Sequence, residues 1–152
     1  MLARQVPLAH EILQEVAIGI AIGRTCNVAL VGIGALTPSS SLLLTRRLTP
    51  EQATRYVAMG AVGDICGRIY DSEGRLFPTS IDEQIIGITL EDLRRIPLVI
   101  AVAYGREKAR AIYGSLRGGL VDTLITDAET AAVVIGYARE SSALLPGPSM
   151  AH

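Results

Sequence analysis

Three features of this sequence stand within or directly after apolar runs and could do chemistry there. Asp64 lies inside the run AVGDIC, Lys108 follows the glycine of AYGREK by three residues, and Gly32–Gly34 form the segment GIG after NVALV. A buried carboxylate needs hydrogen-bond donors or a cation. An ammonium at the start of a helix opposes the helix dipole unless something anionic or richly hydroxylated lies near it. We therefore expect these residues to bind a small polar ligand.

Each of these residues also has a simpler interpretation. The GIG segment can be only a tight turn, since neither GxGxxG nor GK[ST] follows a strand anywhere in the chain. Lys108 can be a surface lysine paired with Glu107 or another acid, and Asp64 can be a carboxylate at a strand end that faces solvent. The residues alone leave these alternatives open.

An enzyme is a further alternative. Asp64, Asp82 or Glu83 could act as a general base. The two histidines, His10 and His152, lie far from these acids in sequence. The sequence therefore gives little support for a Ser-His-Asp or Cys-His site, which needs a histidine near the other catalytic groups.

The charge balance excludes one class of ligand. The chain carries 14 basic and 15 acidic residues, so it lacks the basic excess that holds a nucleic-acid backbone. The pairs Arg46–Arg47 and Arg94–Arg95 are expected on a solvated face. Apolar residues make up 49% of the chain, which is enough for a core and indicates surface that a partner buries.

The cysteines and the two ends of the chain point to an ordinary intracellular domain. Cys26 and Cys66 show no metal-ligand spacing and no disulfide framework, and we expect buried, reduced thiols. The opening MLARQVPLAHEILQEVAIGIAIG is interrupted by acidic residues, so we expect no signal peptide, no membrane span and a cytoplasmic location. We expect one domain over residues 1–140 and a flexible tail over residues 141–152.

The order of elements predicts an α/β fold with a mainly parallel sheet, flanking helices and right-handed crossovers. Thr49, Pro50 and Gln52 form a helix start, Thr89 caps a second helix, and Asp127 is most simply a helix N-cap. Ser72–Gly74 form a turn after a strand that contains Asp64. The remaining expected strands are 28–31, 98–103 and 123–126, with the first apolar on both faces, and the remaining expected helices are 8–22, 106–116 and 128–138.

Four longer stretches together resemble the effector-binding domain of SorC-type bacterial transcriptional regulators, a sugar-binding family also grouped under the DeoR name. They are ALVGIGAL with the following SSLL, AVGDICGRIYDSEG, IDEQIIGITLEDLRRIPLVIAVAYGREKARAI and LRGGLVDTLITDAETA. The resemblance runs from about Val28 to about Val134, with the motifs in the family's order and with compatible spacing.

The resemblance implies a fold similar to the ribose-phosphate isomerase and glucosamine-phosphate deaminase group. It implies a non-enzymatic module, without metal or cofactor, that binds a phosphorylated sugar or a related metabolite. The implied site residues are Gly32, Ile33, Gly34, Asp64 and Lys108. Lys108 would meet an anionic or polar part of the effector and Asp64 its hydroxyls, with Arg46 and Arg47 approaching the same pocket.

The sequence also departs from the family pattern. No helix-turn-helix stands before Leu8, so DNA contact is expected only through such a motif outside this chain. The glycine- and threonine-rich loop expected to hold the phosphate, in an earlier half of the domain, is absent, which makes this chain similar to the C-terminal part of an effector domain. Tyr104 stands where the family usually has a second glycine. A sheet that is incomplete at its N-terminal half favours self-association, so we expect a homo-oligomer.

Three hypotheses follow from these observations. The first is an effector-binding module of a DNA-binding regulator of carbohydrate metabolism, which works by population shift. The second is an enzyme similar to a sugar-phosphate isomerase. The third is an oligomerisation fragment that binds no ligand.

Overall fold

The sheet of this protein has three parallel strands in the order β1-β4-β5. The computed structural model describes residues 5–143, with side chains from residue 11 to residue 141. The strands are β1 (Val28–Gly32), β4 (Leu98–Val102) and β5 (Thr123–Ile125). The predicted α/β class with a mainly parallel sheet is confirmed.

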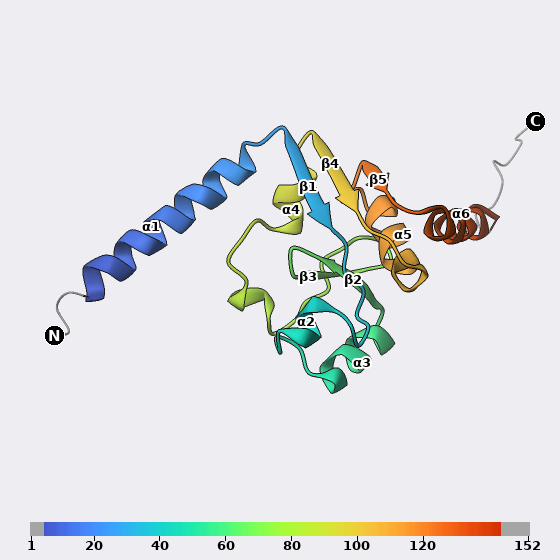
Figure 1. Ribbon diagram of the computed structural model, residues 1–152, viewed down its shortest axis with the longest axis horizontal. Coiled ribbons are helices and arrows are strands. Elements are labelled where there is room, and N and C mark those ends of the chain that lie inside the picture. Colours follow the sequence, from blue (N-terminus) through green and yellow to red (C-terminus); the bar gives the residue numbers. More distant parts are fainter. Residues whose placement is uncertain (1–4, 144–152) are drawn as a thin grey trace, which may run out of the picture.

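A two-stranded antiparallel hairpin forms a second, separate sheet. It comprises β2 (Ala61–Ile65) and β3 (Arg68–Asp71), joined by the two-residue turn Cys66–Gly67. Figure 1 shows the hairpin beyond the arrowheads of β1 and β4, at the carboxyl ends of the parallel strands. Ligands of open α/β sheets bind at this end.

Helices connect the strands and follow the last one, and several begin where the sequence indicates. They are α2 (Ser41–Leu44), α3 (Pro50–Ala58), α4 (Leu90–Arg94), α5 (Ala109–Arg117) and α6 (Ala128–Ala143), with 3-10 turns η2 (Asp82–Gln84) and η3 (Arg106–Lys108). Capping boxes start α3 at Thr49 and α4 at Thr89. Asp127 accepts a hydrogen bond from the Thr130 amide at 2.8 Å, which confirms its expected role as a cap.

Two apolar clusters hold these elements together. The larger fills the space between the inner face of the sheet and α4, α5 and α6. It is built around Ile65, Tyr70, Leu93, Val99 and Ile112. The smaller lies between the hairpin, α2 and α3, around Leu42, Leu48, Tyr56 and Ile69. Since Ile65 and Ile69 belong to different clusters, the hairpin links the two.

The outer face of the sheet corrects one expectation. Strand 28–31 was expected to be buried on both faces, yet Val28 is 53% and Leu30 72% exposed. Val102 and Ile125 are exposed as well. In the described part of the chain, helices cover only the inner face, so alternate residues of each strand stay open to solvent.

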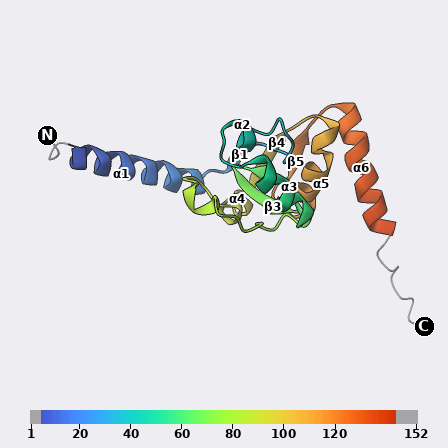
Figure 2. The same cartoon turned by 90° about the horizontal axis from the view of Figure 1, so that it is seen from below.

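The first helix, α1 (Gln5–Arg24), is longer than the expected 8–22 and projects away from the body, as Figures 1 and 2 show. The Arg24 guanidinium pairs with Asp92 at 3.0 Å and anchors the end of α1 near the start of α4. The apolar residues of α1 are spread around the helix and not gathered on one face, so the expected amphipathic pattern is not pronounced, and Ile12, Leu13 and Val16 are exposed.

Three further expectations need adjustment. Both cysteines are exposed, so the expectation of buried thiols was wrong. The helix expected over 106–116 opens with the 3-10 turn η3, which makes Lys108 the residue that precedes α5. Helix α6 continues to Ala143, and residues 144–152 of the expected tail lie outside the described residues.

Candidate functional site

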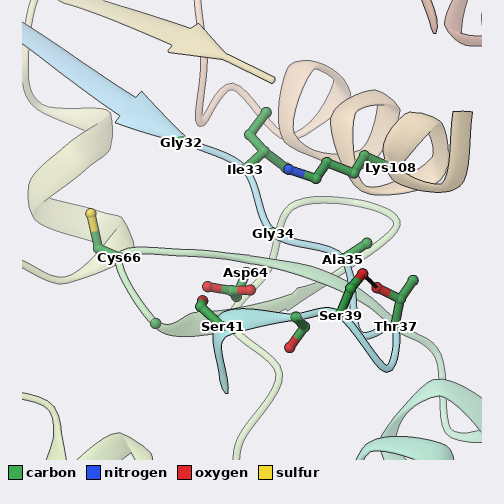
Figure 3. Close-up of a pocket in the computed structure, with 12 residues that line it drawn as sticks. Gly32, Ile33, Gly34, Ala35, Thr37, Ser39, Ser41, Asp64, Cys66 and Lys108 are labelled. Atoms are coloured by element: carbon green, nitrogen blue, oxygen red, sulfur yellow. Dashed lines mark hydrogen bonds between the residues drawn. The ribbon is translucent and has the colours of Figure 1, made fainter. Parts of the chain in front are cut away.

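A cavity of about 450 Å³ opens at the carboxyl end of β1, between the GIG segment, the hairpin and the start of α5. All five residues predicted from the sequence line it: Gly32, Ile33, Gly34, Asp64 and Lys108. Figure 3 shows that the Lys108 side chain reaches toward Ile33, while the Asp64 carboxylate lies on the hairpin side. The structure thus brings together residues that are up to 76 positions apart in the sequence, from Gly32 to Lys108.

Asp64 is buried, which decides between the two interpretations that the sequence leaves open. Its residue exposure is 6%, and its Oδ1 atom has no hydrogen-bond partner. Burial raises the pKa of Asp64, while a hydrogen bond from the Gly67 backbone and the charge of Lys108 act in the opposite direction. A buried carboxylate oxygen without a donor is costly unless a ligand supplies one.

The backbone explains why Asp64 lies where it does. Gly34 and Asp64 form an antiparallel bridge that ties the loop after β1 to strand β2. A Cβ on Gly34 would collide with the Asp64 carboxylate, so a larger residue at position 34 would force this side chain to move. A Cβ on Gly63 would collide with Ala111 of α5 on the other side of the strand. Close packing therefore fixes Asp64 relative to both neighbours.

Tyr70 also ties the hairpin that carries Asp64 to α5. It is fully buried, and its hydroxyl donates to the Ala111 carbonyl oxygen at 3.0 Å. Burial, together with the nearby Asp64 charge, raises the pKa of Tyr70 far above its ordinary value. Tyr70 therefore stays protonated and keeps β3 bonded to α5, the helix that begins after Lys108.

Lys108 supplies the cation of the cavity. It is half-buried and none of the ion pairs of residues 5–143 includes it, so the predicted alternative of pairing with Glu107 does not occur. Its Nζ atom lies 5.9 Å from the centroid of the Tyr104 ring. Lys108 is also the only lysine of the chain, beside 13 arginines. The ammonium and the Asp64 carboxylate thus face one cavity without an ion pair within 4.0 Å.

Hydroxyl groups form a further wall, which the sequence analysis did not assign. Thr37, Ser39, Ser40 and Ser41 line the cavity, and the hydroxyl oxygens of Thr37 and Ser39 lie 3.1 Å apart. The stretch TPSSS was visible after the GIG segment, but its hydroxyls gave no sign of which way they point. In Figure 3 the Ser41 side chain lies beside the Asp64 carboxylate, whereas the hydroxyls of Thr37 and Ser39 point toward each other.

The turn Cys66–Gly67 separates this cavity from a second one of about 420 Å³. Arg47 lines the second cavity, whereas Arg46 is not among its lining residues. Cys66 has a left-handed backbone with φ of 53°. Partial desolvation of its thiol and the Asp64 charge raise the pKa of Cys66.

Two of the three acids considered for an enzyme, Asp82 and Glu83, lie outside the cavity. Asp82 accepts hydrogen bonds from the amide and the hydroxyl of Thr79, at 2.7 and 2.8 Å, and is therefore held within its own turn. Glu83 is exposed on η2, and neither acid lines the cavity with Asp64. Within residues 5–143, no group of three His, Cys, Asp or Glu side chains could hold a metal ion.

The fold and the cavity define a class of protein: a ligand-binding α/β domain whose polar groups meet at the carboxyl ends of parallel strands. Comparisons with known proteins give the family. The family model described as "Putative sugar-binding domain" matches residues 7–136. The chain belongs to this family, the sugar-binding domain of SorC/DeoR-type transcriptional regulators.

Similar proteins agree with this assignment. The transcriptional regulator LsrR of Enterobacter sp. (strain 638) is 35% identical over 115 residues, which are 74% of this chain and 36% of that protein. Among solved structures, a DeoR family transcriptional regulator from Listeria monocytogenes matches with a TM-score of 0.74 and 27% identity, over 80% of this chain and 49% of that one. The full-length sorbitol operon regulator SorC from Klebsiella pneumoniae matches with a TM-score of 0.72 and 30% identity, over 85% of this chain and 42% of that one.

These relatives are named as transcriptional regulators and not as enzymes. The chain spans less than half of each of these proteins. The activity of each whole protein is therefore a property of that protein alone. In the described part of this chain, no helix combines the length and apolar character that crossing a bilayer requires.

Proposed function

We propose that this chain binds a phosphorylated sugar, or a closely related anionic metabolite, in the cavity between Gly32–Gly34, Asp64 and Lys108. One observation carries the proposal: a buried carboxylate with an unpartnered oxygen and the only lysine of the chain face the same cavity without pairing. A ligand with hydroxyl donors and an anionic group would satisfy both. Family membership supports a sugar as the ligand, while the inference that the ligand carries an anionic group depends on Lys108.

The ligand has a natural orientation in this cavity. Its hydroxyls would donate to Asp64 and exchange hydrogen bonds with Thr37, Ser39 and Ser41, which can donate or accept. Its anionic group would accept from the Lys108 ammonium. Arg47, in the adjoining cavity, would meet a second anionic group if the ligand carried one.

We propose a regulatory role for this binding. The domain would act within a transcriptional regulator of carbohydrate metabolism, in the cytoplasm, where the effector shifts the population between two arrangements of the whole protein. DNA contact would come from a helix-turn-helix of the larger protein, since this chain has a net charge of −1 and no basic excess.

We also propose that the chain forms a homo-oligomer. The exposed residues Val28, Leu30, Val102 and Ile125 share the outer face of a parallel sheet, a surface that α/β proteins cover. A second copy would bury this face.

Calorimetric titration tests the binding site. Pentose and hexose phosphates, each with its unphosphorylated sugar, would be titrated into the wild-type chain, Asp64→Asn and Lys108→Met. We expect at least one sugar phosphate to bind the wild-type chain. Asp64→Asn should weaken the binding of every ligand, whereas Lys108→Met should weaken the binding of the phosphorylated ligands selectively. Glu129→Gln and Arg110→Ala, exposed positions away from the cavity, serve as charge-matched controls.

Thiol labelling gives an independent measurement. Cys26 and Cys66 are both exposed, but only Cys66 lines the cavity. A bound ligand should slow labelling of Cys66 and leave Cys26 unchanged. Equal affinity in wild type and both site variants, with no protection of Cys66, would contradict the site. Turnover of a sugar phosphate would favour the enzyme hypothesis, and a flat titration series would favour the fragment that binds no ligand.

A further inference from the structure

Tyr104 is a side chain that the proposed site does not use, although it contacts the cation of that site. It lies two residues after the end of β4, is 70% exposed, and its ring centroid lies 5.9 Å from the Lys108 Nζ atom. A cation within about 6 Å of an aromatic ring centroid is attracted by the ring. Tyr104 itself does not line the cavity, so it is connected to the site only through its contact with Lys108.

The backbone holds Tyr104 and Lys108 at a fixed separation. Between them, Gly105 has a φ of 106°, and its amide donates to the Thr130 hydroxyl at 2.9 Å. Thr130 is fully buried, and its hydroxyl donates to Asp127 at 2.6 Å. The Lys108 amide donates to the Gly105 carbonyl oxygen at 2.9 Å. The backbone on both sides is thus held in place, and the contact between the Lys108 ammonium and the Tyr104 ring joins the two side chains across it.

An aromatic partner leaves the charge of the ammonium intact. A carboxylate beside Lys108 would neutralise the ammonium and occupy its donors, whereas a ring attracts the cation and leaves its N–H groups available. The structure shows no such carboxylate: within residues 5–143, Lys108 takes part in none of the ion pairs.

We propose that Tyr104 is a positioning residue that holds the ammonium of the only lysine at the cavity with its N–H groups available to a ligand. It thereby favours anionic ligands over their neutral analogues. This selectivity rests on the proposed function, whereas the positioning of Lys108 does not.

The single lysine makes the positioning directly measurable without a ligand. Lysine labelled with ¹³C gives one set of Cε–Hε NMR signals, which all belong to Lys108. The ring current of Tyr104 should displace these signals from their random-coil positions in wild type and in Tyr104→Phe. In Tyr104→Leu the displacement should disappear. Signals at the same positions in wild type and Tyr104→Leu would overturn the proposal.

Inorganic phosphate tests the selectivity with the same signals. Titration should move the Lys108 signals, and Tyr104→Leu should bind phosphate about three- to tenfold more weakly than Tyr104→Phe. If phosphate leaves the wild-type signals unmoved, the anion-binding role of Lys108 in the proposed function fails, and the selectivity fails with it. If phosphate moves them equally in the Leu and Phe variants, the proposed function survives and the role of Tyr104 in selectivity is wrong.

Discussion

Gly34 and Asp64 lie face to face and exchange two backbone hydrogen bonds, of 2.9 Å from the Gly34 amide and 3.0 Å from the Asp64 amide. The bridge joins the loop after β1 to strand β2, and so places a buried carboxylate at the carboxyl end of a parallel sheet. It depends on the missing side chain of Gly34, because a Cβ there would occupy the space of the Asp64 carboxylate.

A methyl group at position 34 should therefore disrupt the site. We expect Gly34→Ala to lower the free energy of unfolding by about 1–3 kcal/mol, the usual range for overpacking, and to abolish ligand binding. Gly32→Ala is the matched control, since it lines the same cavity and its Cβ would have no neighbour within 4 Å. Urea denaturation followed by circular dichroism measures the stability of both variants, and calorimetric titration measures their ligand binding. Equal losses in the two variants would show that the bridge does not require a glycine.

Removing the charge of Asp64 should stabilise the protein while it weakens binding. Burial raises the pKa of Asp64, so the folded state retains a proton that the unfolded chain has already released. Stability therefore falls as the pH rises from the ordinary Asp pKa, about 3.9, to the raised folded value, and the cost persists at higher pH. We expect Asp64→Asn to have a higher Tm than wild type at about pH 7, with a difference that shrinks toward about pH 4.

Thermal unfolding at several pH values measures this difference. A Tm of Asp64→Asn below that of wild type at neutral pH would mean that the carboxylate is satisfied within the protein. That result would remove the argument that a ligand completes the site. Glu129→Gln, which removes a carboxylate at an exposed position, is the matched control.

The turn Cys66–Gly67 carries backbone strain that a substitution can relieve. Both residues have positive φ values, 53° and 78°, as in the type I′ turns that favour Asn-Gly. We expect Cys66→Asn to stabilise the protein by about 0.5–1 kcal/mol and Cys66→Val, with a β-branched side chain, to destabilise it. Chemical denaturation distinguishes them. Equal stability of the two variants would indicate that the turn has another conformation in solution.

The outer face of the sheet should control self-association. Leu30 is 72% exposed on this face, and we expect Leu30→Glu to shift the chain toward a monomer in sedimentation velocity experiments. Leu44→Glu is the matched control, because Leu44 is 71% exposed but belongs to α2, outside the sheet. An unchanged mass in Leu30→Glu, or an equal change in both variants, would rule out the outer face as the interface.

Much of the local structure follows from the sequence because it depends on neighbouring residues. The capping boxes at Thr49 and Thr89, the Asp127 cap and the apolar strands are set by interactions over a few positions. The α/β class follows from the alternation of these elements. Residue chemistry singled out Asp64 and Lys108, the resemblance to a known family implied that they line an effector pocket, and their role in binding stays a prediction.

Only the tertiary structure decided which side chains are buried and which of them face the same cavity. The sequence left the burial of Asp64, the partner of Lys108 and the direction of the TPSSS hydroxyls open, because each depends on segments distant in the chain. It also gave wrong expectations for the outer face of β1 and for the cysteines, since apolar or small side chains do not reveal which surface another element covers. Composition and spacing thus determined the elements and the residues available for chemistry, whereas the packing of the hairpin against the end of the sheet determined that they share a cavity.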